Sequence, residues 1–307
     1  MKARLRSLLL ATLPPVAVSA LRALRRMWSR PVEPPKSPVA AATLPETPHE
    51  DDLPEWEMVP DTDEIWSSTG GWAHQSVVET QLAKWQNFLT STAGQRPLGQ
   101  SHEGAADAPA DYATHNTLMS YGYVLGRAAR ERKYLSVLDW GGGLGHYYVY
   151  ARALFPDLSL TYVVKDLSGF CEVGAKLLPE VTFLMDEDEA LSRSYDLVFV
   201  SSSLHYTRDQ YRLLERLCNS AKGWLMITRT PFVEVADDFV VVQRPHRYGY
   251  LTEYPGWFTN RRRFLGFIAE QGFKLERQFL VAEQPNVPNA PEQAQYFGFL
   301  FRRMGGV

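Results

Sequence analysis

Residues 137–145 read VLDWGGGLG, the most informative pattern in the chain for its fold. An apolar run ends in an acid, Asp139, and a glycine-rich loop then leads into the next segment. Glycines permit positive backbone φ and let the backbone approach a ligand closely. A helix that follows such a loop presents unpaired N–H groups at its N-terminus, which favour electronegative groups. The stretch therefore predicts a strand, a ligand-binding turn and a helix, in that order.

Apolar runs alternate with helical patterns after this stretch. The runs predict strands at 135–139, 160–165, 181–185, 196–201 and 224–228. Between or after them, helical patterns cover 145–154, 169–178, 187–192 and 208–220. This alternation predicts a parallel sheet with right-handed crossovers.

The C-terminal part departs from the alternation. Residues 258–271 predict a helix, and 273–281 and 296–302 predict two consecutive strands joined by a loop rich in Pro and Asn. Such a pair is typical of antiparallel strands at a sheet edge. We therefore expect an α/β fold, a Rossmann-like, mostly parallel seven-stranded sheet with an antiparallel edge pair, plus a helical N-terminal extension.

The regions before the sheet differ in composition, and they predict the domain organisation. Helical patterns cover 74–90 and 113–130, whereas 65–72 and 91–111 read as loops. Four parts follow: a basic amphipathic segment at 1–30, a disordered linker at 31–54, a helical N-terminal region at 55–130 and the Rossmann-like domain at 131–307.

Charge is divided unevenly along the chain. Residues 1–30 carry seven Lys and Arg and no acid, which leaves 25 basic against 35 acidic side chains, a net charge of −10, for the rest. An acidic body argues against nucleic acid as a partner. A basic, leucine-rich segment predicts contact with anionic lipid at the inner face of the membrane. Docking on the protein's own body and a cleaved signal peptide ending near Ala20 remain alternatives.

The chain has only two cysteines, Cys171 and Cys218. This number excludes a disulfide framework or a cysteine zinc site, and no metal site is expected. Two reduced thiols in a cytoplasmic protein are the simplest interpretation.

The glycine loop also limits the choice of cofactor. A dinucleotide fingerprint would need a glycine at the sixth position counted from Gly141, where the chain has His146. Asp139 ahead of the glycines would repel a pyrophosphate, but it would attract an ammonium group. The pattern D-x-G-x-G-x-G therefore favours a cofactor that carries an amine.

This loop resembles motif I of the class I S-adenosylmethionine-dependent methyltransferases. The resemblance implies S-adenosylmethionine as cofactor, Asp166 after the second strand as the acid that binds the ribose hydroxyls, and Asp186 after the third strand as a residue that faces adenine. Helix capping or a solvent-exposed position is the alternative interpretation of each of the two acids. The implied cofactor-binding residues are Asp139, Gly141, Gly143, Gly145, Asp166 and Asp186.

Further segments resemble a narrower family of bacterial methyltransferases associated with surface-polysaccharide synthesis. They are Leu13-Pro14-Pro15, 68–72, 138–142, 201–206, 228–231 and 254–258. The resemblance covers most of the chain outside 31–54 and 91–111. It implies an acceptor in surface-glycan synthesis without identifying it.

Three residues are candidates for catalysis. His205 follows the fourth strand, where ligands bind in such sheets, and its ordinary pKa suits a general base for a hydroxyl acceptor. Tyr206 and Arg229 are expected beside it and would bind an anionic or sugar acceptor. A packed histidine and an arginine paired with a carboxylate of the body are the alternatives. Residues 244–250 are expected to close over the acceptor or to form an ordinary polar loop.

These features predict methyl transfer to an unidentified small-molecule or glycan acceptor, such as a hydroxyl of a surface-glycan precursor. Two other functions stay open from the sequence. One is a scaffold that binds the cofactor without turnover, and the other is an NAD-dependent oxidoreductase.

Overall fold

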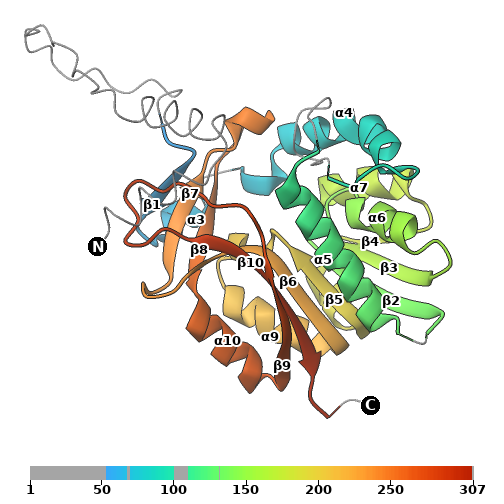
Figure 1. Ribbon diagram of the computed structural model, residues 1–307. Coiled ribbons are helices and arrows are strands. Elements are labelled where there is room, and N and C mark those ends of the chain that lie inside the picture. Colours follow the sequence, from blue (N-terminus) through green and yellow to red (C-terminus); the bar gives the residue numbers. More distant parts are fainter. Residues whose placement is uncertain (1–52, 68–69, 100–109, 131, 306–307) are drawn as a thin grey trace, which may run out of the picture. The chain divides into compact units, whose positions relative to one another are not determined.

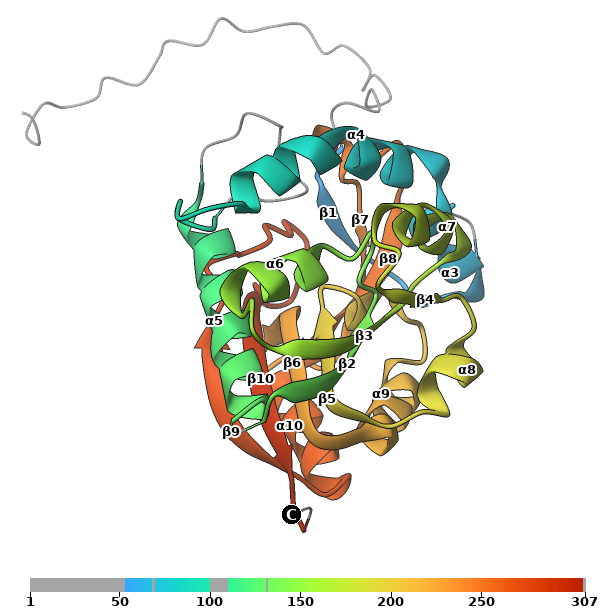
Figure 2. The ribbon, with the colours of Figure 1, turned by 90° about the vertical axis from the view of Figure 1, so that its right-hand side faces the viewer.

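Five parallel strands form the centre of the structure, a computed structural model that describes residues 53–67, 70–99, 110–130 and 132–305 (Figures 1 and 2). Their order is β4-β3-β2-β5-β6. The bounds, in that order, are Thr182–Leu184, Ser159–Lys165, Tyr134–Trp140, Tyr195–Ser201 and Ala221–Val233. The chain runs outward from β2 to β4 and then returns to β5. This reversal makes the sheet Rossmann-like, with a crevice beyond the carboxyl ends of β2 and β5.

Two antiparallel strands follow β6 on its other side. β10 (Gln295–Arg303) pairs antiparallel with β6 from Gln295 opposite Phe232 to Arg302 opposite Trp224. β9 (Phe273–Leu280) pairs antiparallel with β10. Both strands lie close to the ranges expected from the sequence.

The expected number of seven strands is wrong, because the sheet has ten among the described residues. β1 (Trp56–Val59), β7 (Phe239–Gln243) and β8 (Tyr254–Asn260) form an antiparallel extension, joined to β6 through Phe232 and Val233 of that strand. All of β7 is buried, as a short apolar strand requires. β8 escaped prediction because its Pro-Gly pair, Pro255 and Gly256, is a turn signal.

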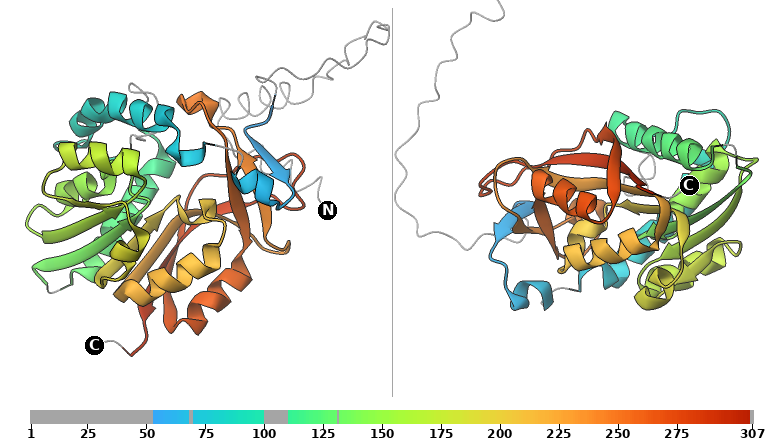
Figure 3. Two further views of the ribbon diagram at one scale, coloured as in Figure 1. Left: turned by 180° about the vertical axis from the view of Figure 1, so that it is seen from behind. Right: turned by 90° about the horizontal axis from the view of Figure 1, so that it is seen from below.

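Helices cover both faces of the sheet (Figure 3). Adjacent residues of β2 point to opposite sides, so that Val137 belongs to one core and Leu138 to the other. The Val137 side packs against α4 (Gln75–Thr92), α5 (Tyr112–Ala128), α6 (His146–Leu154) and α7 (Ser168–Leu177). The Leu138 side packs against α8 (Glu187–Leu191), α9 (Gln210–Ser220) and α10 (Arg261–Glu270).

Short helices complete the connections: α3 (Asp63–Ser67), and the 3-10 turns η2 (Gly71–Ala73), η3 (Leu204–Tyr206) and η4 (His246–Tyr248). The loop expected at 65–72 therefore contains helical turns. α10 begins three residues later than expected because Asn260 ends β8 and its side chain accepts from the Arg263 N–H as the helix cap.

The predicted domain parts can be compared with the structure only in places. Segment 1–30 and nearly all of linker 31–54 lie outside the described residues. The described ones belong to one unit, Asp52–Val307, and a boundary at residue 130 stays a prediction. None of the helices in this described part has both the length and the apolar character to cross a bilayer.

Candidate functional site

A cleft of about 370 Å³ opens at the carboxyl ends of the parallel strands. The glycine loop after β2, Asp166 after β3, the turn after β5 and Arg229 of β6 all line it. Aromatic side chains form much of the remaining wall: Trp66, Trp72, Trp140, Tyr147, Tyr206 and Tyr254. The position agrees with the rule that open parallel sheets bind ligands where the strand order reverses.

The three predicted glycines of the loop have positive φ, of +70° at Gly141, +58° at Gly143 and +89° at Gly145. A Cβ on Gly141 would lie 2.3 Å from the Ser203 side chain, and one on Gly145 would lie 2.7 Å from Leu178. Gly141 and Gly145 are thus required by packing within the protein. At Gly143 the closest neighbour would be the Gln81 Oε1 at 3.3 Å, which leaves this glycine's surface to the cleft. Gly145 does not line the cleft, which differs from its predicted cofactor contact.

Asp166 lines the cleft with a fixed carboxylate. Its Oδ2 accepts from the Gly143 N–H and its Oδ1 from the Leu167 N–H, each at 2.7 Å. Burial raises the pKa of this carboxyl, and the two N–H donors offset part of that rise. The hydrogen bond to Gly143 ties the end of β3 to the glycine loop, so the acid and the loop keep one mutual geometry.

Asp139 lies beneath the loop and not in the cleft wall. Its side chain is 1% exposed, and Oδ2 accepts from the Tyr162 hydroxyl at 3.0 Å. A Cβ on Gly142 would lie 2.6 Å from the Asp139 Cγ, so the carboxyl sits directly under the cleft floor. Burial raises its pKa to about 7. The predicted direct contact between Asp139 and an ammonium group is therefore not possible in this arrangement, because the carboxyl lies beneath the glycine loop that forms the cleft floor.

Asp186 is outside the cleft lining. It is exposed, and its Oδ1 accepts from the Glu189 N–H at 2.6 Å as the N-cap of α8. The capping alternative describes what this acid does, and an adenine-facing role has no support in this geometry.

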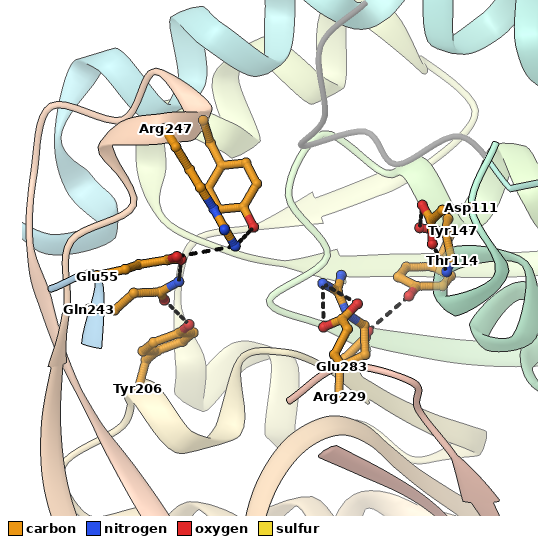
Figure 4. A network of polar contacts seen from close by, with 11 residues as sticks. Glu55, Asp111, Thr114, Tyr147, Tyr206, Arg229, Gln243, Arg247 and Glu283 are labelled. Atoms are coloured by element: carbon orange, nitrogen blue, oxygen red, sulfur yellow. Dashed lines mark hydrogen bonds and ion pairs between the residues drawn. The ribbon is translucent and has the colours of Figure 1, made fainter. Parts of the chain in front are cut away.

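Tyr206 and Arg229 do lie at the cleft, as expected. The Tyr206 hydroxyl donates to Gln243 Oε1 at 2.7 Å. The Arg229 guanidinium pairs with Glu283 at 3.2 Å, as the alternative interpretation anticipated (Figure 4). Arg229 has a φ of +53°, a strained value for a residue with a side chain.

His205 is a correction to the expected site. It is 0% exposed and absent from the cleft lining, packed with its ring centroid 4.0 Å from that of Tyr206. Neither ring nitrogen has a hydrogen-bond partner among the described residues. Burial and the Arg229 charge lower the pKa of His205 to about 3. A ring so weakly basic and so enclosed has no access to an acceptor proton.

A second cavity of about 370 Å³ adjoins the first. The two share Trp72, Ser202, Tyr206, Arg229 and Tyr254. The second is lined further by three carboxylates, one more arginine and several aromatic rings: Glu55, Asp111, Glu283, Arg247, Trp56, Tyr248, Tyr250 and Tyr296. Both of its arginines are engaged with carboxylates, Arg229 with Glu283 and Arg247 with Glu55 at 3.2 Å (Figure 4).

Segment 244–250 contributes to this second cavity through Arg247, Tyr248 and Tyr250. Glu283, in the loop before β10, and Gln81 of α4 carried no signal in the sequence, and Trp72 was marked only as part of the resembling segment 68–72. Trp72 stacks on Tyr254 with ring centroids 4.5 Å apart, across a sequence distance that no local pattern reveals. Within the described residues, no group of three or more His, Cys, Asp or Glu could hold a metal ion.

Comparisons with known proteins give limited matches. No family model matches the chain. A trans-aconitate 2-methyltransferase from Deinococcus radiodurans is 31% identical over 102 residues, which are 33% of this chain and 40% of that protein. The chain thus spans well under half of this curated relative's length.

Solved structures resemble it at low identity. Magnesium protoporphyrin IX methyltransferase from Synechocystis PCC 6803, with bound S-adenosylmethionine, aligns with a TM-score of 0.46 and 12% identity over 80% of this chain and all of that one. Mitomycin 7-O-methyltransferase aligns with a TM-score of 0.42 and 15% identity over 76% of this chain and 69% of that one.

Proposed function

We propose that this chain is an S-adenosylmethionine-dependent methyltransferase whose cofactor binds in the cleft over the glycine loop. The observation that carries the proposal is the pairing of an uncovered Gly143 with the fixed Asp166 carboxylate, both on the cleft. The carboxylate suits a ribose diol, and the bare backbone admits the adjoining part of the ligand. The partial match to a curated methyltransferase supports the same activity.

The site fits this cofactor better than NAD. A pyrophosphate on the loop would lie over the Asp139 carboxyl, which is buried under Gly142. Whenever that carboxyl is ionised, it would repel the pyrophosphate. A cofactor with an ammonium and a sulfonium would be attracted instead. A scaffold that binds the cofactor without turnover would need no second cavity for an acceptor. The second cavity observed here adjoins the cleft and shares five of its residues, which favours an enzyme.

The acceptor proposed is a hydroxyl of a surface-glycan precursor, held in the second cavity. Aromatic faces there suit the apolar face of a sugar ring, and carboxylates and phenols suit its hydroxyls. Both arginines of the cavity are paired with carboxylates, which leaves no unpaired positive charge and one carboxylate in excess, Asp111. This balance disfavours a polyanionic acceptor such as the trans-aconitate named for the relative.

The chemistry proposed is an in-line displacement that depends on alignment. The bound cofactor would supply a methyl group activated by a positively charged sulfur. The acceptor oxygen would form a bond to that carbon while the carbon–sulfur bond breaks and its electron pair stays on sulfur. Glu283 lines the second cavity and pairs with Arg229, which lines both cavities; its carboxylate would receive the hydroxyl proton and pass it to solvent.

The cellular location expected from the sequence is also part of our proposal. The protein would work in the cytoplasm, with the basic residues 1–30 contacting anionic lipid at the inner face of the membrane. These residues lie outside the described part of the chain, and the charge pattern alone supports this contact.

The experiment that tests the function follows the methyl group itself. Cells that contain or lack this protein are grown with methyl-deuterated methionine, and their surface glycans are hydrolysed and analysed by mass spectrometry. A sugar that carries a deuterated methyl ether only in cells with the protein would support the proposal. Identical glycan methylation in both strains would contradict the acceptor, and retention of label with Glu283→Gln would contradict the proton route.

A further inference from the structure

Gln81 of α4 carries a buried acceptor that the protein leaves unused. The side chain is 4% exposed and lines the cleft. Its Oε1 is shielded from water and has no hydrogen-bond partner among the described residues. Buried acceptors without partners are rare and cost free energy, so each one needs an explanation.

The amide is held in place from its other end. Its Nε2 donates to the Tyr250 hydroxyl at 3.2 Å, in the segment before β8. With the nitrogen so anchored, Oε1 faces Gly143, where it would lie 3.3 Å from a methyl group placed on that glycine. The free acceptor therefore stands beside the one glycine of the loop whose surface the protein leaves to the cleft.

We propose that Gln81 Oε1 accepts a hydrogen bond from the α-ammonium group of the cofactor's methionine portion. This inference rests on the proposed function and assigns the N-terminal helix α4 a part in cofactor recognition. The protein's own acidic candidate for that contact, Asp139, is beneath the loop, and its carboxyl has no route to the cleft. An ammonium donor would satisfy the orphaned oxygen, whose removal from water is already complete in the free protein.

The test compares two ligands that differ in this part of the molecule. S-adenosylhomocysteine carries the amino acid portion, whereas 5′-methylthioadenosine lacks it. Both are titrated by calorimetry into the wild-type chain, Gln81→Leu and Gln81→Glu. Gln86→Leu is the matched control, because Gln86 is exposed on the same helix. Thermal unfolding of each ligand-free variant checks the fold.

Gln81→Leu is expected to weaken binding of S-adenosylhomocysteine by about 10- to 100-fold, as for loss of a hydrogen bond to a charged group, and to change binding of 5′-methylthioadenosine by less than about 2-fold. Gln81→Glu keeps an acceptor oxygen and is expected to retain affinity for S-adenosylhomocysteine. Gln86→Leu should bind both ligands as the wild type does. Gln81→Leu removes the unsatisfied acceptor but also the hydrogen bond from Nε2 to the Tyr250 hydroxyl, so the two effects oppose each other and the ligand-free variant should still unfold cooperatively at a similar temperature.

An equal loss for both ligands, or no loss for either, would overturn the assignment of Gln81. If Gln81→Glu loses as much affinity as Gln81→Leu, the amide acts as a donor, and the inference is wrong in its chemistry. If the wild type binds neither ligand, the proposed function itself fails, which is a separate outcome.

Discussion

Replacing Asp139 with Asn tests whether a carboxyl is buried beneath the cleft floor. The group is 1% exposed, and its only hydrogen bond among the described residues comes from Tyr162, whose hydroxyl also contacts that of Tyr121 at 3.0 Å. Burial, the main cause, raises the pKa of Asp139 from 3.8 to about 7, and the nearby Asp166 charge adds to the rise.

The size and sign of the effect follow from this shift. Below pH 3.8 both the folded and the unfolded chain hold the proton, so there is no penalty. Between pH 3.8 and 7 the unfolded chain ionises while the folded one does not, and stability falls by about 1.4 kcal/mol per pH unit. Above pH 7 the penalty is constant at about 4 kcal/mol. An Asn amide left with an unpaired N–H costs about 1–3 kcal/mol, so the net gain at pH 8 is about 1–3 kcal/mol.

The measurement is urea unfolding of the ligand-free wild type and Asp139→Asn at pH 5.5 and pH 8. The difference in free energy of unfolding between the two chains should favour the variant by about 2 kcal/mol more at pH 8 than at pH 5.5. A difference that stays constant between these pH values would refute the raised pKa. A difference that favours the wild type more at pH 8 would mean that folding lowers the pKa of Asp139.

Four further predictions concern the site and the N-terminal segment. Asp166→Ala should weaken S-adenosylhomocysteine binding by about 1–3 kcal/mol in calorimetry. An unchanged dissociation constant would mean that Asp166 only holds the glycine loop in place and does not contact the cofactor. Gly143→Val puts a branched side chain at a φ of +58° on the cleft and should abolish binding while thermal unfolding stays cooperative; normal affinity would contradict the loop assignment. His205→Phe removes two unsatisfied nitrogens and should leave turnover within a few-fold and its pH profile unchanged, whereas a loss of roughly 10²–10⁴ would restore His205 as the base. Deleting residues 1–30 should abolish sedimentation with anionic vesicles and keep cofactor affinity, and equal sedimentation of both chains would exclude lipid contact.

The sequence predicted the elements that depend on local patterns. The run Leu197–Val200 is apolar because both faces of its strand are buried, and a buried parallel strand can be predicted from such a run alone. The strand β8 was missed because its partner β7 and the end of β6 override the turn preference of Pro255 and Gly256. Such pairing depends on tertiary context that no local window contains.

The candidate site was predictable to a similar extent. Glycine and acid positions follow directly from the strand ends, so Gly141, Gly143 and Asp166 could be placed from the sequence. Which way a side chain points could not, and this separates Asp139 beneath the loop and His205 behind Tyr206 from the cleft itself. Gln81 and Glu283 reach the site from α4 and from the loop before β10, and their positions depend on the packing of the whole sheet.

Calorimetric titration of the wild-type chain with S-adenosylhomocysteine, beside an identical titration with NAD⁺, shows which cofactor the cleft binds. One saturable site for S-adenosylhomocysteine and no heat of binding for NAD⁺ is the predicted result. Binding of NAD⁺ at the cleft, or no binding of S-adenosylhomocysteine, would contradict the proposed methyltransferase function.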